Sequence, residues 1–247
     1  NFGPDILIHM AAQPLVRHSY ADPYLTYETN VIGTINVLEA CRKCKSIKTI
    51  LNVTTDKVYE NKEWCWGYRE YEKLGGKDPY SSSKSCSELV TSAYYESFFK
   101  SKGLSVASAR AGNVIGGGDW SDDRLIPDLL KSIQRKETVE LRYPNAVRPW
   151  QHVIEPIFGY LVLIQYLFSN PEKFSGAWNF GPLSSDTMTV KEIVETFISK
   201  WPGGGKWKLF EGEKPHEASN LYLDTSKSRK ELKYKSIWGI EKTISLI

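Results

Sequence analysis

Short apolar segments alternate with longer amphipathic ones through the first half of the chain. The short segments are rich in Ile, Leu, Val and Ala, as in strands buried on both faces, and cover residues 5–10, 48–53 and 104–109. The longer segments, 24–43 and 79–100, follow a helical pattern, and the first places Val31, Ile35 and Leu38 on one stripe. This order of strands and helices predicts a parallel sheet covered by helices.

Beyond residue 118 the pattern changes, and no long run typical of parallel strands follows. Helices are expected at residues 124–135, 155–168, 190–200 and 225–232, with an edge strand at 206–210. We therefore predict an α/β fold in two parts. Residues 1–120 form a Rossmann-like parallel sheet whose first strands are missing, and residues 121–247 form mainly a smaller substrate-binding part.

Composition is that of an ordinary globular protein, with 41% hydrophobic and 25% charged residues among 247. The net charge is only +3, and Lys and Arg are spread along the chain, so nothing favours nucleic-acid binding. The longest apolar stretch, 154–168, contains Glu155 and Gln165 and is shorter than the roughly 20 residues that cross a bilayer. It predicts a buried helix, and no membrane partner is expected.

The four cysteines are Cys41, Cys44, Cys65 and Cys86. The Cys41-x-x-Cys44 spacing lacks a second Cys or His pair for zinc, and it lies at the end of a helical pattern, where a thiolate gains no stabilisation. Reduced thiols of a cytoplasmic protein are expected, and no metal site. The chain begins without Met and runs directly into an apolar strand, so we expect both ends to be cut.

Tyr80 and Lys84 form a Tyr-x-x-x-Lys pattern at the start of a predicted helix. Residues four apart share a helix face, so the Lys84 ammonium can lie near the phenol and favour its ionised form. A tyrosine with a lowered pKa is a usable base near neutral pH. The pattern alone is weak, because a packed Tyr with a solvated Lys is its commoner meaning. Thr55 follows the strand at 48–53, where ligands bind in α/β sheets, so it is expected to meet Tyr80.

Several motifs in the same order resemble the extended short-chain dehydrogenases. Besides Thr55, Tyr80 and Lys84, they are residues 11–14 (AAQP), 29–34 (TNVIGT) and 110–116 (RAGNVIG). The resemblance implies NAD as cofactor. It also implies a cofactor-binding set of Ala11, Ala12, Gln13, Asn30, Tyr80 and Lys84.

Asp56 and Lys57 indicate which branch of that family the chain resembles. The nucleotide-sugar 4,6-dehydratases carry an acidic residue after the threonine, followed usually by Glu. Lys57 resembles the CDP-glucose branch instead, as do residues 13–17 (QPLVR) and 116–120 (GGGDW). The resemblance implies NAD-dependent 4,6-dehydration of a nucleoside diphosphate hexose, most closely CDP-glucose. The implied catalytic residues are Thr55, Asp56, Lys57, Tyr80 and Lys84, with Asp56 as the acid and the group that removes the C5 proton left open.

Other functions stay open at this point: another nucleotide-sugar dehydratase or 4-epimerase, a non-catalytic scaffold, or an inactive fragment. The G-x-G-x-x-G fingerprint that binds dinucleotides is not found. The glycines at 116–118 are expected to form a flexible loop near the substrate, because Ser121 stands where the last glycine belongs. We therefore expect this chain by itself to bind NAD poorly and to expose a sheet edge.

The substrate is expected to need cations for its diphosphate. Residues 148–153 (RPWQHV) resemble the family segment whose arginine holds that group, and residues 216–217 resemble its nucleotide-binding stretch. The implied substrate-binding set is Arg17, Asn113, Arg124, Arg148 and His216. The family often pairs the helices at 24–43 and 79–100 in a dimer, so a homodimer or larger assembly is expected.

Overall fold

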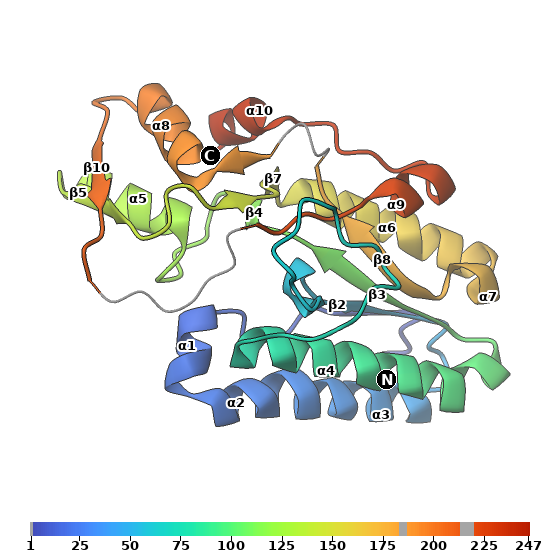
Figure 1. Ribbon diagram of the computed structural model, residues 1–247. Helices are drawn as coiled ribbons and strands as arrows, with labels where there is room; N and C mark the ends of the chain where they lie inside the picture. Colours follow the sequence, from blue (N-terminus) through green and yellow to red (C-terminus); the bar gives the residue numbers. More distant parts are fainter. Residues whose placement is uncertain (1, 183–186, 213–219) are drawn as a thin grey trace.

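The computed structural model describes residues 2–182, 187–212 and 220–247 (Figure 1). Its centre is a parallel sheet of four strands in the order β1-β2-β3-β8. The strands are β1 (Ile6–His9), β2 (Thr49–Val53), β3 (Ser105–Ala111) and β8 (Gly176–Phe180). The first three confirm the strands predicted from the sequence. β1 lies at one edge of this sheet and leaves Ile6 and Ile8 about 40% exposed.

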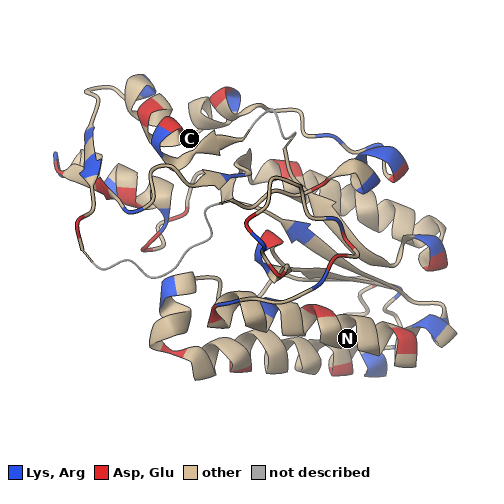
Figure 2. Cartoon of the chain, in the orientation of Figure 1, with Lys and Arg blue, Asp and Glu red and all other residues tan. Residues whose placement is uncertain are grey.

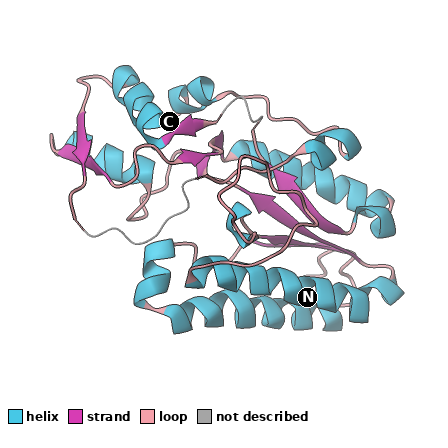
Figure 3. Cartoon of the chain, in the orientation of Figure 1, coloured by secondary structure: helices cyan, strands magenta, loops and turns pink. Residues whose placement is uncertain are grey.

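One face of the sheet is covered by the helices of the first half of the chain (Figure 3). They are α1 (Val16–Ala21), α2 (Pro23–Tyr27), the π turn η1 (Glu28–Ile32), α3 (Gly33–Lys43), α4 (Pro79–Tyr94), the π turn η3 (Tyr95–Phe99) and the 3-10 turn η4 (Lys100–Lys102). Leu38, Ile50, Phe99 and Val106 form the core between these helices and the sheet. Both predicted helices are confirmed, but α1 was not expected, since residues 13–22 show no apolar period.

The opposite face of the sheet is covered by α6 (Ile154–Ser169), α7 (Pro171–Phe174) and α9 (Ser226–Glu231). Leu51, Leu163 and Trp178 are fully buried in this second core. Gly159 lets α6 approach β8, because a Cβ at this position would lie 2.5 Å from the Phe180 ring. β8 and α6 both follow residue 120, so the chain returns to the sheet in its second half. The division into parts at that residue stays a prediction.

The remaining elements form a smaller lobe beside the carboxyl ends of the strands. They are β4 (Val114–Ile115), α5 (Leu125–Gln134), β5 (Thr138–Leu141), β6 (Val147–Arg148), β7 (Gln151–His152), β9 (Met188–Thr189), α8 (Val190–Lys200), β10 (Lys206–Leu209) and α10 (Ile240–Ser245). β10 pairs in parallel with β5, which confirms the predicted edge strand. The four predicted helices of this half are found as α5, α6, α8 and α9.

Charged residues of both signs are interspersed over the elements (Figure 2). No helix among the described residues is long and apolar enough to cross a membrane. In the same part of the chain, no group of three or more His, Cys, Asp or Glu side chains could hold a metal ion. All four cysteines are unpaired, and Cys41 is buried.

Candidate functional site

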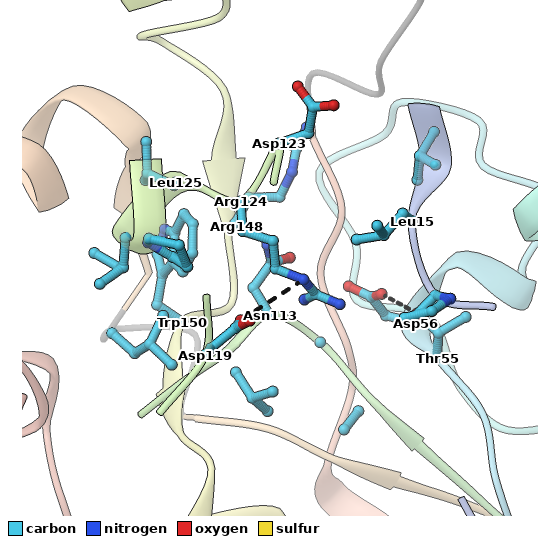
Figure 4. Close-up of a pocket in the computed structure, with 18 of the residues that line it drawn as sticks. Leu15, Thr55, Asp56, Asn113, Asp119, Asp123, Arg124, Leu125, Arg148 and Trp150 are labelled. Atoms are coloured by element: carbon cyan, nitrogen blue, oxygen red, sulfur yellow. Dashed lines mark hydrogen bonds and ion pairs between the residues drawn. The ribbon is translucent and has the colours of Figure 1, made fainter. Parts of the chain in front are cut away.

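A cavity of about 400 Å³ opens where the carboxyl ends of β1, β2 and β3 face the smaller lobe. It brings together most of the residues predicted from the sequence, namely Arg17, Thr55, Asp56, Lys57, Tyr80, Asn113, Arg124 and Arg148. Figure 4 shows Thr55 and Asp56 on one side of this cavity, with Arg124 and Trp150 across from them. Side chains far apart in sequence therefore converge at the place where open α/β sheets bind ligands.

Asp56 is the buried carboxylic acid of the cavity. It follows β2 in the 3-10 turn η2 (Asp56–Val58), is only 1% exposed, and its Oδ1 accepts a 2.9 Å hydrogen bond from the Thr55 hydroxyl. Its Oδ2 is buried and has no hydrogen-bond partner among the described residues. Burial raises the pKa of Asp56, while the charges of Lys57 and Arg148 and the bond from Thr55 act in the opposite direction. A carboxyl group that holds its proton more strongly is suited to act as an acid.

Gly112 makes room for this carboxyl group at the end of β3. A Cβ at this position would lie 2.4 Å from the Pro149 ring and 3.2 Å from Asp56 Oδ2. A larger residue would therefore displace either the loop that carries Arg148 or the carboxyl group itself.

Tyr80 lies in the first turn of α4 and is 7% exposed. Asp78 caps this helix by accepting from the Ser81 amide at 2.9 Å, and Ser19 of α1 accepts from the Tyr80 amide at 3.1 Å. Burial raises the pKa of Tyr80 to about 12, although a hydrogen bond with Thr55 and the charge of Arg124 oppose this effect. The direction is opposite to the lowered pKa expected from Lys84, because burial of the phenol outweighs the cations around it.

Lys84 is buried one helical turn beyond Tyr80, and its ammonium donates a 3.0 Å hydrogen bond to the Val53 carbonyl. Burial lowers its pKa to about 8, while the charge of Glu88 one turn further along the helix raises it. Tyr80 and Lys84 thus lie on one helix face as predicted, but the Lys84 ammonium is hydrogen-bonded to the last residue of β2. Its ammonium keeps further N–H donors for a ligand.

Replacing Lys84 with methionine should stabilise the fold at neutral pH. Lys84 binds its proton more weakly in the folded protein, where its pKa is about 8, than in the unfolded chain, where the pKa of lysine is near 10.4. The buried ammonium therefore destabilises the fold fully below pH about 8, and this cost is relieved as pH rises above that value. We expect Lys84→Met to raise the unfolding free energy at pH 7 by about 1–3 kcal/mol, after loss of the Val53 bond. Urea unfolding at pH 7 and at pH 10 measures this gain, which should shrink at the higher pH.

The control for this substitution is Lys102→Met, at an exposed lysine in η4, which should change stability by less than about 0.5 kcal/mol. A Lys84→Met protein less stable than the wild type at pH 7 would contradict the assignment of a costly buried ammonium.

The loop and helix predicted to bind the cofactor are held together by amide side chains. The Asn30 side chain accepts a 2.8 Å hydrogen bond from the backbone N–H of Gln13, and it donates to the backbone carbonyl of Gln13 and to the Ser83 hydroxyl. Asn30 lies within the π turn η1, a local widening of the helix that is frequent at functional sites. Ala11 is exposed and Ala12 half-buried in the same loop. These residues, like Lys84, border the site without lining the main cavity.

The cationic side of the cavity is formed by arginines from different elements. Arg148 is 5% exposed and donates to the Val147 carbonyl at 2.9 Å, and its charge acts on Asp56. Arg124, before α5, lies 3.7 Å from Asp119, and Arg17 of α1 is paired with Asp123. Gly116 and Asp119 line the same cavity, and the role of their loop near a substrate stays a prediction. His216 lies outside the described residues.

A buried ion pair beneath the cavity was not predicted as part of the site. Glu88 and Arg110 are 4% and 3% exposed and form two short hydrogen bonds of 2.8 and 2.7 Å. Glu88 also accepts from Thr54, and Arg110 donates to the Tyr59 hydroxyl. The pair thereby joins α4 and β3 to Thr54, which follows β2 and precedes Thr55. Its sequence signal was the arginine that opens the RAGNVIG motif, together with a glutamate one turn after Lys84.

The fold and the cavity define an α/β enzyme of the short-chain dehydrogenase type, with a Tyr-x-x-x-Lys helix at the carboxyl ends of a parallel sheet. The chain belongs to the family described as GDP-mannose 4,6 dehydratase, whose family model matches residues 1–247. The resemblance drawn from the motifs is thereby confirmed.

Relatives and solved structures agree with this family. The chain is 50% identical over 251 residues to the CDP-glucose 4,6-dehydratase of Salmonella typhimurium, a match that covers 100% of this chain and 70% of that protein. It is 30% identical over 258 residues to UDP-glucose 4-epimerase 3 of Oryza sativa, covering 96% and 66%. The structure of UDP-glucuronic acid 4-epimerase from Bacillus cereus with UDP-glucuronic acid and NAD matches with a TM-score of 0.84 at 20% identity, covering 98% and 73%. This last likeness confirms the Rossmann-like fold.

Proposed function

We propose that the protein catalyses NAD-dependent 4,6-dehydration of a nucleoside diphosphate hexose, CDP-glucose, to the 4-keto-6-deoxy sugar nucleotide. The observation that carries this proposal is the buried Asp56, which shares one cavity with Thr55 and Tyr80 and has a carboxyl oxygen with no hydrogen-bond partner in the described part of the chain. An enzyme that only oxidises and reduces C4 has no need of a buried acid at this place. The 50% identity to a CDP-glucose 4,6-dehydratase supports the same reaction.

The residues at the end of β2 fit the nicotinamide half of the cofactor. The ammonium of Lys84 bonds Val53 and has donors left for ribose hydroxyls, and Asn30 fixes the loop of Ala11, Ala12 and Gln13 beside it. When bound, NAD supplies the oxidant for C4 and the reductant for C6. Tyr80 accepts the proton of the sugar 4-hydroxyl as its phenolate, and because burial raises the Tyr80 pKa to about 12, this step needs the positive charges of bound NAD and Lys84 to favour the phenolate.

Elimination of water across C5 and C6 needs an acid at the leaving hydroxyl and a group at the C5 proton. Asp56 donates the proton to the 6-hydroxyl, since burial keeps its carboxyl group protonated to a higher pH than usual. Lys57, half-buried and next along the chain, lines the same cavity, and it is the candidate for the C5 proton only as a neutral amine, because an ammonium has no lone pair to accept a proton. Its positive charge also limits the rise of the Asp56 pKa.

The diphosphate of the substrate needs cationic donors, and Arg148, Arg124 and Arg17 line the cavity on the side of the smaller lobe and α1. Asn113 follows β3 and can donate its side-chain amide to the same group. His216 keeps its predicted role at the nucleotide, outside the described residues.

Because the sequence predicts weak NAD binding by this chain alone, the proposed reaction is tested with a family-like N-terminal segment added, by incubating that protein and NAD with CDP-glucose or, separately, with dTDP-glucose. We expect a product from CDP-glucose that mass spectrometry finds lighter by one water, and none with Tyr80→Phe. Product from dTDP-glucose would overturn the choice of nucleotide and keep the chemistry. An isomer of unchanged mass would identify a 4-epimerase, and no product from either sugar with NAD bound would overturn the reaction.

We also infer a homodimer formed through α2, α3 and α4. Large apolar side chains are exposed on these helices and on the π turn η1 between α2 and α3, among them Tyr24 at 76%, Leu89 at 59% and Ile32 at 50%. Sedimentation velocity at micromolar concentration checks this inference, and a monomer would contradict it. The unpaired cysteines agree with a cytoplasmic location.

A further inference from the structure

The cavity that we assign to the substrate has both cationic and acidic groups on its walls. The cations are Arg17, Lys57, Arg124, Arg142 and Arg148, and the acidic groups are Asp56, Asp119, Asp123, Asp128 and Glu140. A nucleoside diphosphate adds negative charge to such a cavity. The diphosphate binds most tightly if it replaces a protein carboxylate as the partner of these cations.

Asp123 is the carboxylate that holds two of these cations. A single oxygen, Oδ1, accepts from Nη1 of Arg17 and, at 3.3 Å, from Nη1 of Arg142. Arg17 comes from α1 on the side of the sheet, whereas Arg142 follows β5 in the smaller lobe. The Asp123 side chain therefore joins the two walls of the cavity, and Figure 4 shows it beside Arg124 and Leu125.

Among the described residues, each of the two arginines makes one hydrogen bond to Asp123. Two guanidinium groups share one carboxylate oxygen, although each has a planar fork suited to two parallel bonds. A diphosphate has more oxygen atoms and more negative charge than a carboxylate, so it can accept two parallel hydrogen bonds from each guanidinium group at the same time.

The conformation and the surroundings of Asp123 are both energetically unfavourable. Its backbone has a φ of 59°, in the left-handed region that is uncommon for residues other than glycine, although Asp and Asn tolerate it. Asp128, one turn into α5, has its pKa raised by burial and by the charge of Asp123. An exposed carboxylate with a like-charged neighbour, kept there by two arginines, is easily displaced by a stronger anion.

We propose that Arg142 is a further substrate-binding residue and that Asp123 competes with the diphosphate of the sugar nucleotide for Arg17 and Arg142. This inference rests on the proposed function, since it requires a nucleoside diphosphate in the cavity. On binding, the diphosphate takes both guanidinium groups, and the Asp123 side chain turns toward solvent, where it is already 36% exposed.

Calorimetric titration with CDP and with cytidine separates the diphosphate contacts from the base contacts. We expect Arg142→Ala to weaken CDP binding about 10-fold and cytidine binding less than about twofold, because only the phosphate contact is lost. We expect Asp123→Asn to tighten CDP binding about threefold or more, because the competing charge is removed and Asn keeps the backbone conformation. Both effects on CDP should diminish in high salt.

Two controls change the same charges outside the cavity. Arg135→Ala removes an exposed arginine after α5, and Asp122→Asn removes the neighbouring carboxylate that pairs with Lys131. Neither should change the affinity for CDP by more than about twofold.

The outcomes distinguish this inference from the proposed function. If wild-type protein binds CDP no better than cytidine, the nucleotide-sugar site itself is wrong, and this inference falls with it. If wild-type protein prefers CDP but Arg142→Ala leaves that preference intact, or Asp123→Asn weakens CDP binding, then the trio of Arg17, Asp123 and Arg142 is a structural link and only the inference is overturned.

Discussion

Replacing Asp56 with asparagine should lower the rate of dehydration about 10²- to 10⁴-fold, the usual contribution of a positioned acid. Asparagine keeps the size of the side chain and can still accept from the Thr55 hydroxyl at 2.9 Å, but it has no proton to give to the leaving 6-hydroxyl. Oxidation at C4 depends on Tyr80 and Thr55 and should survive. Quenched single-turnover reactions should therefore contain a keto sugar nucleotide that is two hydrogens lighter than CDP-glucose and still carries its water.

The same substitution should not destabilise the protein at neutral pH. Burial raises the pKa of Asp56 in the folded state, so its contribution favours folding at low pH and is lost as pH rises through the raised pKa. Above that pH a buried carboxylate opposes folding, and a neutral amide relieves it. Thermal unfolding at pH 7 should thus give an equal or higher midpoint for Asp56→Asn.

Asp122→Asn is the matched control, because Asp122 lies two residues before Arg124 but does not line the cavity. It should retain the dehydration rate. If Asp56→Asn still released the keto-deoxy product at near the wild-type rate, Asp56 would not be the acid.

Breaking the Glu88–Arg110 pair should produce the largest loss of stability. Glu88→Gln leaves the Arg110 guanidinium 3% exposed and without its carboxylate, a change that costs about 3–5 kcal/mol for buried pairs. That is a large part of the roughly 5–15 kcal/mol by which domains are stable. Denaturant unfolding of the wild type and the variant measures the difference, and a double variant with Arg110→Met should lose less than the sum of the single changes.

Glu96→Gln is the corresponding control. It breaks the Lys100–Glu96 pair, whose side chains are 47% and 58% exposed, and should cost less than about 0.5 kcal/mol. Equal losses for Glu88→Gln and Glu96→Gln would contradict a special role for burial. The comparison matters for the site, because Glu88 accepts from Thr54 and acts on Lys84 from the same helix.

Local patterns in the sequence were sufficient for the first strands and the main helices. β1, β2 and β3 were predicted from continuous apolar runs, which strands buried on both faces need, although β1 lies at the sheet edge and is partly exposed. A helix over Tyr80 and Lys84 needs only its own periodicity. β8 was missed, since its five residues carry no such run and become a strand only by pairing with β3. α1 was missed as well, because it is short and is held from outside by the Ser19 contact with Tyr80.

The sequence by itself determined which residue types stand at the strand ends, and therefore the family and the set of candidate site residues. Only the tertiary structure decided their chemical state. The pKa of Tyr80 is raised rather than lowered, and that of Lys84 is lowered, because burial depends on elements that arrive from distant parts of the chain. The contact of Asp123 with Arg17 and Arg142 likewise joins residues from separate elements. Periodicity and motif spacing describe neighbours along the chain, whereas burial and charge pairing depend on which of these segments meet in space.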